Sequence, residues 1–149
     1  MDLSVKYSEF AFASDAYLKA VELRRQVLRV PLGLSWEPNA FEAEDLSFHL
    51  GGFADNELIA AVILKPVDKR TVKMRQFAIS PAFQSKGVGS GLLKFAEDCA
   101  GRHGYQLIVA HARASALRFY QHRGYIVSGD PFTEVTIAHH YISKQLHSA

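Results

Sequence analysis

The sequence predicts an α/β domain built on one central sheet with helices packed against it. Strand-like alternation and helix-like periodicity follow one another in the order β-α-(short helix)-β-β-β-α-β-α-β-β. The chain has 149 residues, a length that fits one domain, so we expect residues 1–149 to form a single unit. A hydrophobic fraction of 48% and a charged fraction of 21% are typical of a soluble globular protein.

The first strand and helix are predicted near the N-terminus. Val5–Ala11 reads as a strand, and Ser14 is suited to cap a helix that runs to about Val30. Pro31 and Gly33 stop this helix because neither residue continues helical hydrogen bonding well. A loop or short helix follows.

Three strands are predicted in the middle of the chain. Leu46–Phe53 and Leu58–Val67 form a hairpin, and Thr71–Ile79 is expected to run antiparallel to the strand before it. The apolar residues of this third strand change phase between Met74 and Phe77. Either a β-bulge or burial of the strand on both faces explains the change.

The second half of the chain contains the clearest helical pattern. One continuous apolar face comprises Val88, Leu92, Phe95, Ala96 and Cys99. Gly101 and Gly104 are expected to end this helix. The elements predicted after it are a buried, parallel-type strand at Leu107–Ala110, a helix at Ser115–Arg123 closed by Gly124, and strands at Tyr125–Ser128 and Val135–Ser143.

A glycine-rich turn precedes that amphipathic helix. Gly87 and Gly89 let the backbone approach an anion at the helix N-terminus, where amide groups are free, and Ser85 and Lys86 add a hydroxyl and a cation. The dinucleotide fingerprint fails because Leu92 stands where it needs glycine, and the order Lys-Gly fails the P-loop pattern. A purely structural turn remains the alternative at this point.

The segment Phe77–Leu93 resembles the acetyl-CoA motif of the GNAT superfamily of N-acetyltransferases: an apolar strand, a proline turn, then Q/R-x-x-G-x-G/A opening a helix. The resemblance implies a GNAT-like α/β (α+β) domain. It implies a mixed, mostly antiparallel sheet of about six or seven strands, splayed between its fourth and fifth strands, with helices on both faces.

The resemblance also implies that acetyl-CoA is the co-substrate. The backbone of Phe77 and Ile79 should bond the pantetheine arm, and the amides of Ser85–Ser90 should cradle the pyrophosphate. The implied donor-binding residues are Phe77, Ala78, Ile79, Gln84, Ser85, Lys86, Gly87, Val88, Gly89 and Ser90.

A second signature lies further along the chain. Ala116–Tyr125 resembles the family's A-x-x-F-Y-x-x-x-G-F/Y segment, although Arg113 stands where many members have asparagine. By this resemblance Tyr120 lies beside the thioester sulfur and donates a proton or a hydrogen bond to the departing thiolate. The alternative is that Tyr120 and Phe119 are both core aromatic residues.

Candidates for the acceptor side follow from two weaker resemblances. Pro131–His140 is similar to a P-F-x-E-x-x-I-P-H segment of one GNAT subgroup, with Ala138 in place of proline. This implies that Glu134 and His139 face the active cleft as candidate catalytic groups; a surface acid and an edge-strand histidine are the alternative.

The segment Leu23–Arg29 resembles the first helix of the same subgroup, which usually lines the acceptor site. Arg24 and Arg29 are therefore candidates to bind an acidic group of the acceptor. Arginines that extend over the surface are the alternative.

Charge and composition exclude several other classes. The net charge of the chain is +2, and the basic residues are scattered along it, so we expect no nucleic-acid partner. No apolar run approaches the ~20 residues of a membrane span, and the N-terminus lacks a signal peptide, so we expect a cytoplasmic protein. The histidines and the single cysteine show no metal-ligand spacing, so no metal is expected, and Cys99 is interpreted as a core residue.

The sequence therefore predicts an acyl-CoA-dependent N-acyltransferase in which a small-molecule or peptide amine attacks acetyl-CoA directly within a ternary complex. The acceptor is not identified by the sequence. A non-catalytic acyl-CoA sensor and a binder of another nucleotide are the alternatives. Family members often dimerise through sheet edges, so the resemblance also allows a homodimer.

Overall fold

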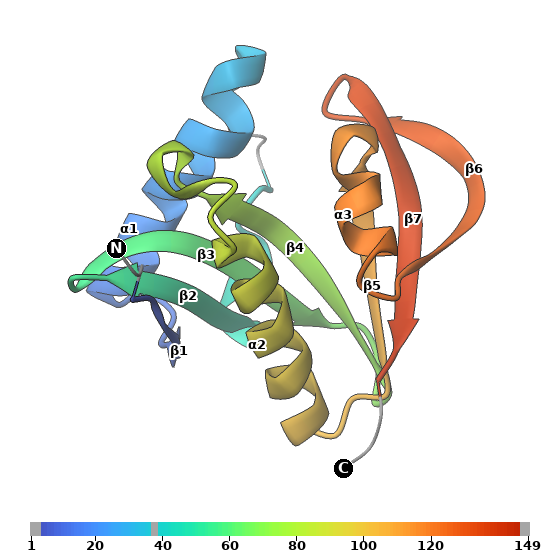
Figure 1. Cartoon of the computed structure of the whole chain (residues 1–149), viewed down its shortest axis with the longest axis horizontal. Coiled ribbons are helices and arrows are strands. Elements are labelled where there is room, and N and C mark those ends of the chain that lie inside the picture. The colour runs from blue at the N-terminus through green and yellow to red at the C-terminus, as the bar shows by residue number, and fades with distance from the viewer. Residues whose placement is uncertain (1–3, 37–38, 147–149) are drawn as a thin grey trace.

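The computed structural model describes residues 4–36 and 39–146. Within them the chain forms one sheet in the order β1-β2-β3-β4-β5-β7-β6 (Figure 1). The strands are β1 (Lys6–Phe10), β2 (Phe48–Ala54), β3 (Glu57–Pro66), β4 (Thr71–Ile79), β5 (Leu107–Arg113), β6 (Ile126–Glu134) and β7 (Ile137–Gln145). Only β4 and β5 pair in parallel; the other neighbours are antiparallel. The predicted mixed, mostly antiparallel sheet is confirmed.

Helices cover both faces of the sheet. The three α-helices are α1 (Asp15–Arg24), α2 (Val88–Arg102) and α3 (Leu117–Gln121). Figure 1 shows α2 in front of the strands and α1 behind them. Alternation along β4 explains both contacts: Ala78 packs in the cluster that contains α1, whereas Phe77 and Ile79 pack against the cluster that contains α2.

The first helix begins as its cap predicts. The Ser14 side chain accepts a hydrogen bond from the backbone N–H of Tyr17 at 3.2 Å. Beyond α1 the chain keeps turning through a π-helical segment at Arg25–Arg29 and a 3₁₀ turn at Val30–Leu32. Gly33 then takes a left-handed conformation with φ of 68°, so the predicted stop is confirmed.

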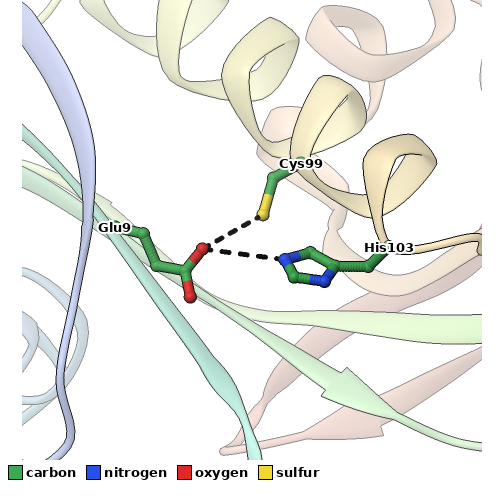
Figure 2. A group of neighbouring side chains, drawn as sticks. All are labelled: Glu9, Cys99 and His103. Atoms are coloured by element: carbon green, nitrogen blue, oxygen red, sulfur yellow. Dashed lines mark hydrogen bonds and ion pairs between the residues drawn. The ribbon is translucent and has the colours of Figure 1, made fainter.

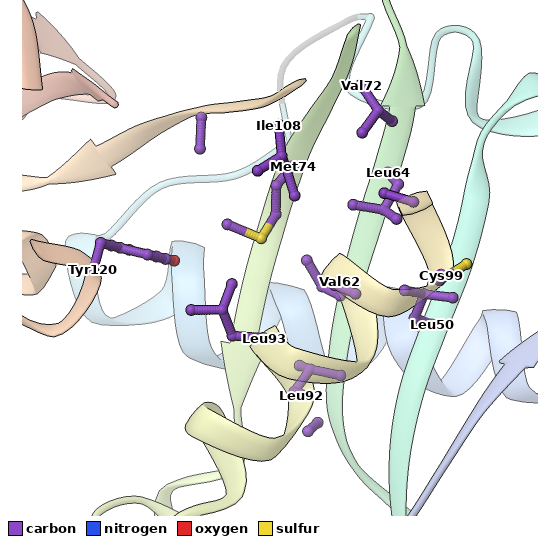
Figure 3. Packing of buried hydrophobic residues seen from close by; sticks show 14 of the residues in the cluster. Leu50, Val62, Leu64, Val72, Met74, Leu92, Leu93, Cys99, Ile108 and Tyr120 are labelled. Atoms are coloured by element: carbon purple, nitrogen blue, oxygen red, sulfur yellow. The ribbon is translucent and has the colours of Figure 1, made fainter. Parts of the chain in front are cut away.

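The core lies between α2 and strands β2 to β5. Leu92 and Ala96 of α2 are fully buried and pack with aliphatic residues such as Leu50 and Val62 (Figure 3). The prediction that Gly101 ends α2 is wrong, because the helix includes it. Gly104, with φ of 89°, takes the left-handed conformation at the end instead.

A β-bulge distorts the end of β4. Ala61 of β3 faces Ala78, yet Ile63 faces Arg75, so two residues of β4 oppose one residue of β3. Gln76, at the bulge, has φ of 58°. The bulge that explains the phase change is therefore confirmed.

The bulge coincides with the opening of the sheet. β5 pairs with β4 only from Thr71 to Met74, opposite Leu107–Ala110. Beyond these four pairs the two strands diverge, as Figure 1 shows. The predicted splay between the fourth and fifth strands is confirmed.

The C-terminal strands differ from the sequence-based expectation in two respects. The strand predicted at Tyr125–Ser128 continues to Glu134. Val135 was expected to begin a strand, but Val135 and Thr136 form the turn between β6 and β7, with φ of 45° and 68°. Two-residue hairpin turns need such positive φ values. β-Branched residues rarely adopt them, so the local sequence did not indicate a turn. Among the described residues no helix is long and apolar enough to cross a membrane.

Candidate active site

A cavity of about 280 Å³ lies where β4 and β5 separate. Its walls come from the segment after α1, the bulged end of β4, the end of β5, α3, and the β6–β7 turn. They include Leu28, Arg29, Lys73, Met74, Arg75, Gln76, Phe77, His111, Ala112, Arg113, Ala116, Tyr120, Glu134, Val135 and His139. Tyr120, Glu134, His139 and Arg29 were predicted for this site from three separate segments of the sequence.

Within the described part of the chain, the edge of β4 that faces β5 is not paired with a strand beyond the bulge. The N–H of Ser80 donates to the carbonyl of Ile59 at 2.8 Å, on the β3 side. Because backbone groups alternate along a strand, those of Phe77 and Ile79 point to the open side, toward β5. The Gln84 side chain donates to the Ile79 carbonyl at 2.9 Å. An extended, amide-containing ligand could pair along this edge as an added strand does.

The N-terminus of α2 continues this edge. Gly87 has φ of 83°, with open space where a Cβ would stand, and Ser85 has φ of 61°. The first helical N–H groups have no partner within a helix, and they point outward with the positive end of the helix dipole. The exposed Lys86 lies on the same turn. This surface fits the pyrophosphate-type anion that the sequence predicts.

Arg123 adds a cation that the sequence analysis did not single out. Its Nε lies 3.3 Å from Ser90 Oγ, its Nη1 donates to the Phe119 carbonyl at 2.8 Å, and its guanidinium lies over the Phe119 ring at 3.9 Å. The contacts hold a positive charge next to the first turn of α2. Only the packing of α3 against that turn brings Arg123 there.

Tyr120 is at once a core residue and a cavity residue. The side chain is 6% exposed, and its ring lies near Phe77 and Phe119, with centroids 6.1 and 5.1 Å away. Figure 3 shows the ring extending from α3 toward Met74 and Leu93. Burial raises the pKa of the Tyr120 phenol well above its ordinary value, so the group stays neutral and remains a hydrogen-bond donor.

Glu134 stands between two histidines. Its Oε1 lies 3.1 Å from His111 Nδ1, and its Oε2 lies 3.7 Å from His139 Nε2. His111 was not predicted from the sequence as a residue of this site; its place directly after the apolar run Leu107–Ala110 was the signal that could have found it. The three side chains come from β5, β6 and β7.

The tautomer of His139 follows from its second contact. His139 Nδ1 lies 3.0 Å from the carbonyl oxygen of Ile137, which can only accept, so Nδ1 carries a proton. Nε2 is then the nitrogen that gains or loses a proton, and it faces the carboxylate. At 3.7 Å the contact exceeds a hydrogen bond, so direct proton transfer between the two groups needs a closer approach.

The cavity lining also includes several cations, namely Arg29, Lys73, Arg75 and Arg113. Arg113 Nη2 donates to the Leu28 carbonyl at 3.0 Å, and burial together with the nearby Arg29 lowers the pKa of Arg113. Burial and the neighbouring Arg75 also lower the pKa of Lys73. Among the described residues, Arg29 Nε is buried without a hydrogen-bond partner. The cavity thus combines one carboxylate with several positive groups.

Arg24 does not line this cavity. Its Nη1 and Nη2 donate to the two Glu44 oxygens at 3.0 and 2.7 Å, and both side chains are 1% exposed. The Tyr17 hydroxyl donates to the same carboxylate at 2.6 Å. The expectation that Arg24 binds an acceptor is not supported, because its hydrogen bonds are directed to a buried internal partner.

Comparison with known proteins agrees with the fold. Residues 15–125 match the sequence model of the acetyltransferase (GNAT) family. The chain is 26% identical over 127 residues to N-acetyltransferase YitI of Bacillus subtilis, itself uncharacterized; the match covers 81% of this chain and 85% of that protein.

Solved structures share the architecture. One is the crystal structure of a protein from Lactobacillus plantarum whose sequence is 24% identical to this chain. The TM-score is 0.86, and the match covers 97% of this chain and 99% of that chain. A GNAT family acetyltransferase from Elizabethkingia anophelis, crystallised with acetyl-CoA bound, is 18% identical, with a TM-score of 0.76 and coverage of 95% and 98%. At these identities the likeness concerns the fold.

Proposed function

The chain belongs to the acetyltransferase (GNAT) family, and from that premise we propose that it transfers the acetyl group of acetyl-CoA to an amine held in the cavity. One observation carries the proposal: the cavity at the sheet opening is continuous with a free strand edge and contains a buried tyrosine and a carboxylate between histidines. These are the parts that acyl transfer from a thioester needs.

The donor is proposed to lie along the edge of β4. Its pantetheine amides pair with the backbone of Phe77 and Ile79, and its pyrophosphate accepts from the amides of Ser85–Ser90 at the N-terminus of α2. The free backbone edge and the open space at Gly87 support this placement. The acetyl-CoA bound to the Elizabethkingia anophelis relative supports the choice of donor.

The reaction is proposed to be direct attack within a ternary complex. An alkyl amine of pKa ~10.4 is largely protonated near neutral pH, so a base must take its proton. Glu134 accepts that proton, with His139 Nε2 as the next acceptor at 3.7 Å. The amine nitrogen then bonds to the thioester carbonyl carbon, and the C–S bond breaks as the tetrahedral intermediate collapses.

Tyr120 is proposed to stabilise the thiolate that leaves. Because burial raises the pKa of its phenol, full proton transfer to a thiolate becomes less favourable. A hydrogen bond from the neutral hydroxyl is therefore the stronger part of its role. The attacking nitrogen loses its second proton as the intermediate collapses, and that proton passes through solvent to the departing thiolate. The base and the hydrogen-bond donor come from different elements, Glu134 from β6 and Tyr120 from α3.

The acceptor is proposed to carry an anionic group as well as its amine. Arg29, Arg113, Lys73 and Arg75 line the cavity, and the buried Nε of Arg29 has no partner among the described residues. A carboxylate or phosphate on the acceptor would pair with these groups. Amino acids and peptides with acidic side chains fit this description better than simple alkyl amines.

The direct test is release of free CoA thiol from acetyl-CoA with a panel of amines, including neutral amines and amines that bear a carboxylate. We expect turnover with the anionic set. Acetyl-CoA binding without turnover on any acceptor would favour a sensor. Thermal stabilisation by ATP or NAD but not by acetyl-CoA would contradict the donor assignment.

Gly89→Glu tests the anion site, because it places negative charge on the first turn of α2. We expect loss of acetyl-CoA binding, measured by calorimetry. Gly89→Ala is the matched control: a Cβ there would meet Phe119 at 3.6 Å, an ordinary contact. Retained affinity in Gly89→Glu would show that the phosphates bind elsewhere.

Tyr120→Phe tests the leaving-group role. We expect kcat to fall about tenfold or more while acetyl-CoA affinity stays unchanged, since only the transition state needs the hydroxyl. Stopped-flow and equilibrium binding measure the two quantities. Unchanged kcat would restrict Tyr120 to packing.

A further inference from the structure

A second cluster of reactive side chains lies outside the cavity. Glu9 extends from β1, Cys99 from the C-terminal part of α2, and His103 from the C-cap position of this helix; Figure 2 shows the three side chains pointing toward one another. Residues four apart on a helix share a face, which brings the thiol and the imidazole together. None of the three belongs to the cavity lining.

The spacing of the three ligand atoms suits a small cation. Cys99 Sγ lies 3.7 Å and His103 Nε2 lies 3.8 Å from the same oxygen, Glu9 Oε1, and all three ligand atoms lie within 4.8 Å of one another. Tetrahedral zinc with ordinary bond lengths separates its ligand atoms by roughly 3.3–3.6 Å. Only small side-chain movements would bring the three ligand atoms to the spacing of zinc ligands.

One weak hydrogen bond, from the Cys99 thiol to Glu9 Oε1 at 3.7 Å, joins the cluster, and it does not account for the position of His103. The imidazole-to-carboxylate distance exceeds that of a hydrogen bond, and a thiol is a weak donor. The fully buried Cys99 is nevertheless turned toward the half-exposed Glu9 and His103, rather than wholly into the aliphatic core. The Phe48 ring, with its centroid 4.3 Å from that of His103, packs against the imidazole and limits where it can turn.

We propose that Glu9, Cys99 and His103 form a Zn²⁺ site that fastens the edge strand β1 to the end of α2. A thiolate, an imidazole and a carboxylate are the ligands that this borderline-soft ion accepts, and a water molecule from the exposed side supplies the fourth position. On binding, the Cys99 S–H bond breaks, sulfur bonds to the metal, and the proton passes to solvent.

The role differs from that of the acyl-transfer cavity. The site joins two segments about 90 residues apart, and one of them is the edge strand β1, paired on only one side within the described sheet. Binding to the folded state alone stabilises that state. We therefore expect the metal to raise the unfolding temperature without taking part in acetyl transfer.

Cobalt(II) is the probe for the test, because Co²⁺ occupies zinc sites and a cobalt–thiolate bond absorbs in the near ultraviolet. The chain has a single cysteine, so this band reports on Cys99 alone. The full chain, stripped with a chelator, is titrated with Co²⁺, followed by displacement with Zn²⁺. We expect one equivalent of Co²⁺ to bind, the band to appear, and Zn²⁺ to abolish it.

Variants assign the ligands. Glu9→Gln and His103→Gln should each weaken Co²⁺ binding by more than about 100-fold, beyond the effect of losing an outer contact. Cys99→Ala should remove the band while circular dichroism reports an unchanged fold. His122→Gln, at an exposed histidine outside the cluster, is the matched control. Absence of the band at saturating Co²⁺, or unchanged affinity in Glu9→Gln and His103→Gln, would overturn the proposal.

Discussion

Two carboxylates, Glu44 and Glu134, differ in their burial and in their hydrogen-bond partners. Glu44 is 1% exposed, and both of its oxygens accept from Arg24, with a third hydrogen bond from the Tyr17 hydroxyl. Glu134 is 45% exposed and is flanked by two imidazoles at 3.1 and 3.7 Å. Glu44 thus accepts hydrogen bonds from fixed, buried donors. Glu134 instead faces a cavity, and its partners are histidines.

Burial and the kind of partner together distinguish a structural carboxylate from a reactive one. A buried carboxylate with fixed donors loses much if one partner is removed, but it is inaccessible to a substrate. A half-exposed carboxylate beside histidines stabilises the fold little, yet it can exchange protons at neutral pH. An arginine or a glutamate in a segment that resembles a family motif can have either role, and the sequence alone does not say which.

Arg24→Ala tests the structural side and has the largest expected effect. Removing one partner of a buried ion pair leaves Glu44 uncompensated, so we expect the free energy of unfolding to fall by about 3–5 kcal/mol. Urea denaturation measures it. Arg25→Ala, which breaks the exposed pair with Glu22, is the control and should leave stability within the range of surface substitutions. Equal losses in both variants would remove the distinction.

Glu134→Gln tests the reactive side. The amide keeps the shape of the side chain but accepts no proton, so we expect kcat/KM to fall about 100-fold. Stability should change little because the residue is half exposed. Steady-state kinetics and urea denaturation are compared with those of Asp130→Asn, an exposed acid on the same strand. An active Glu134→Gln would require another base.

The contribution of the Glu44–Arg24 pair to stability should also depend on pH, which is a smaller effect than that of either substitution. Burial alone would raise the pKa of Glu44, but hydrogen bonds from Arg24 and Tyr17 outweigh it and hold that pKa below its ordinary value. The folded state therefore binds this proton less readily than the unfolded state. The stabilisation is complete above the unfolded pKa of ~4.3 and is lost as pH falls through the folded pKa.

Urea denaturation over a pH series measures this loss. We expect the difference in stability between the natural sequence and Arg24→Ala to shrink as the solution becomes acidic. A difference that is constant with pH would mean that the pair contributes through packing alone.

Much of the fold follows from local pattern. The caps at Ser14 and Gly33, the strands of the hairpin and the apolar face of α2 depend on residues within one or two turns of each other, and these predictions are confirmed. The phase change in β4 likewise encodes the bulge in a few consecutive residues. The glycine-rich turn proposed to bind the donor was recognisable for the same reason, since it lies within one continuous segment.

The turn at Val135 and Thr136 shows where such patterns mislead. Both residues favour strands, yet both adopt positive φ because β6 and β7 must reverse direction there. Pairing along nine-residue strands outweighs the preference of two residues. The reversal also holds Glu134 at the cavity.

The order of the elements, the bulge in β4 and the glycine-rich turn before α2 followed from the sequence, because each is set by neighbours along the chain. The tertiary structure alone decided which side chains meet. It paired Arg24 with Glu44 rather than with a ligand, set His111 beside Glu134, and gathered Glu9 with Cys99 across 90 positions. Such contacts depend on how whole elements pack, and no local periodicity records that.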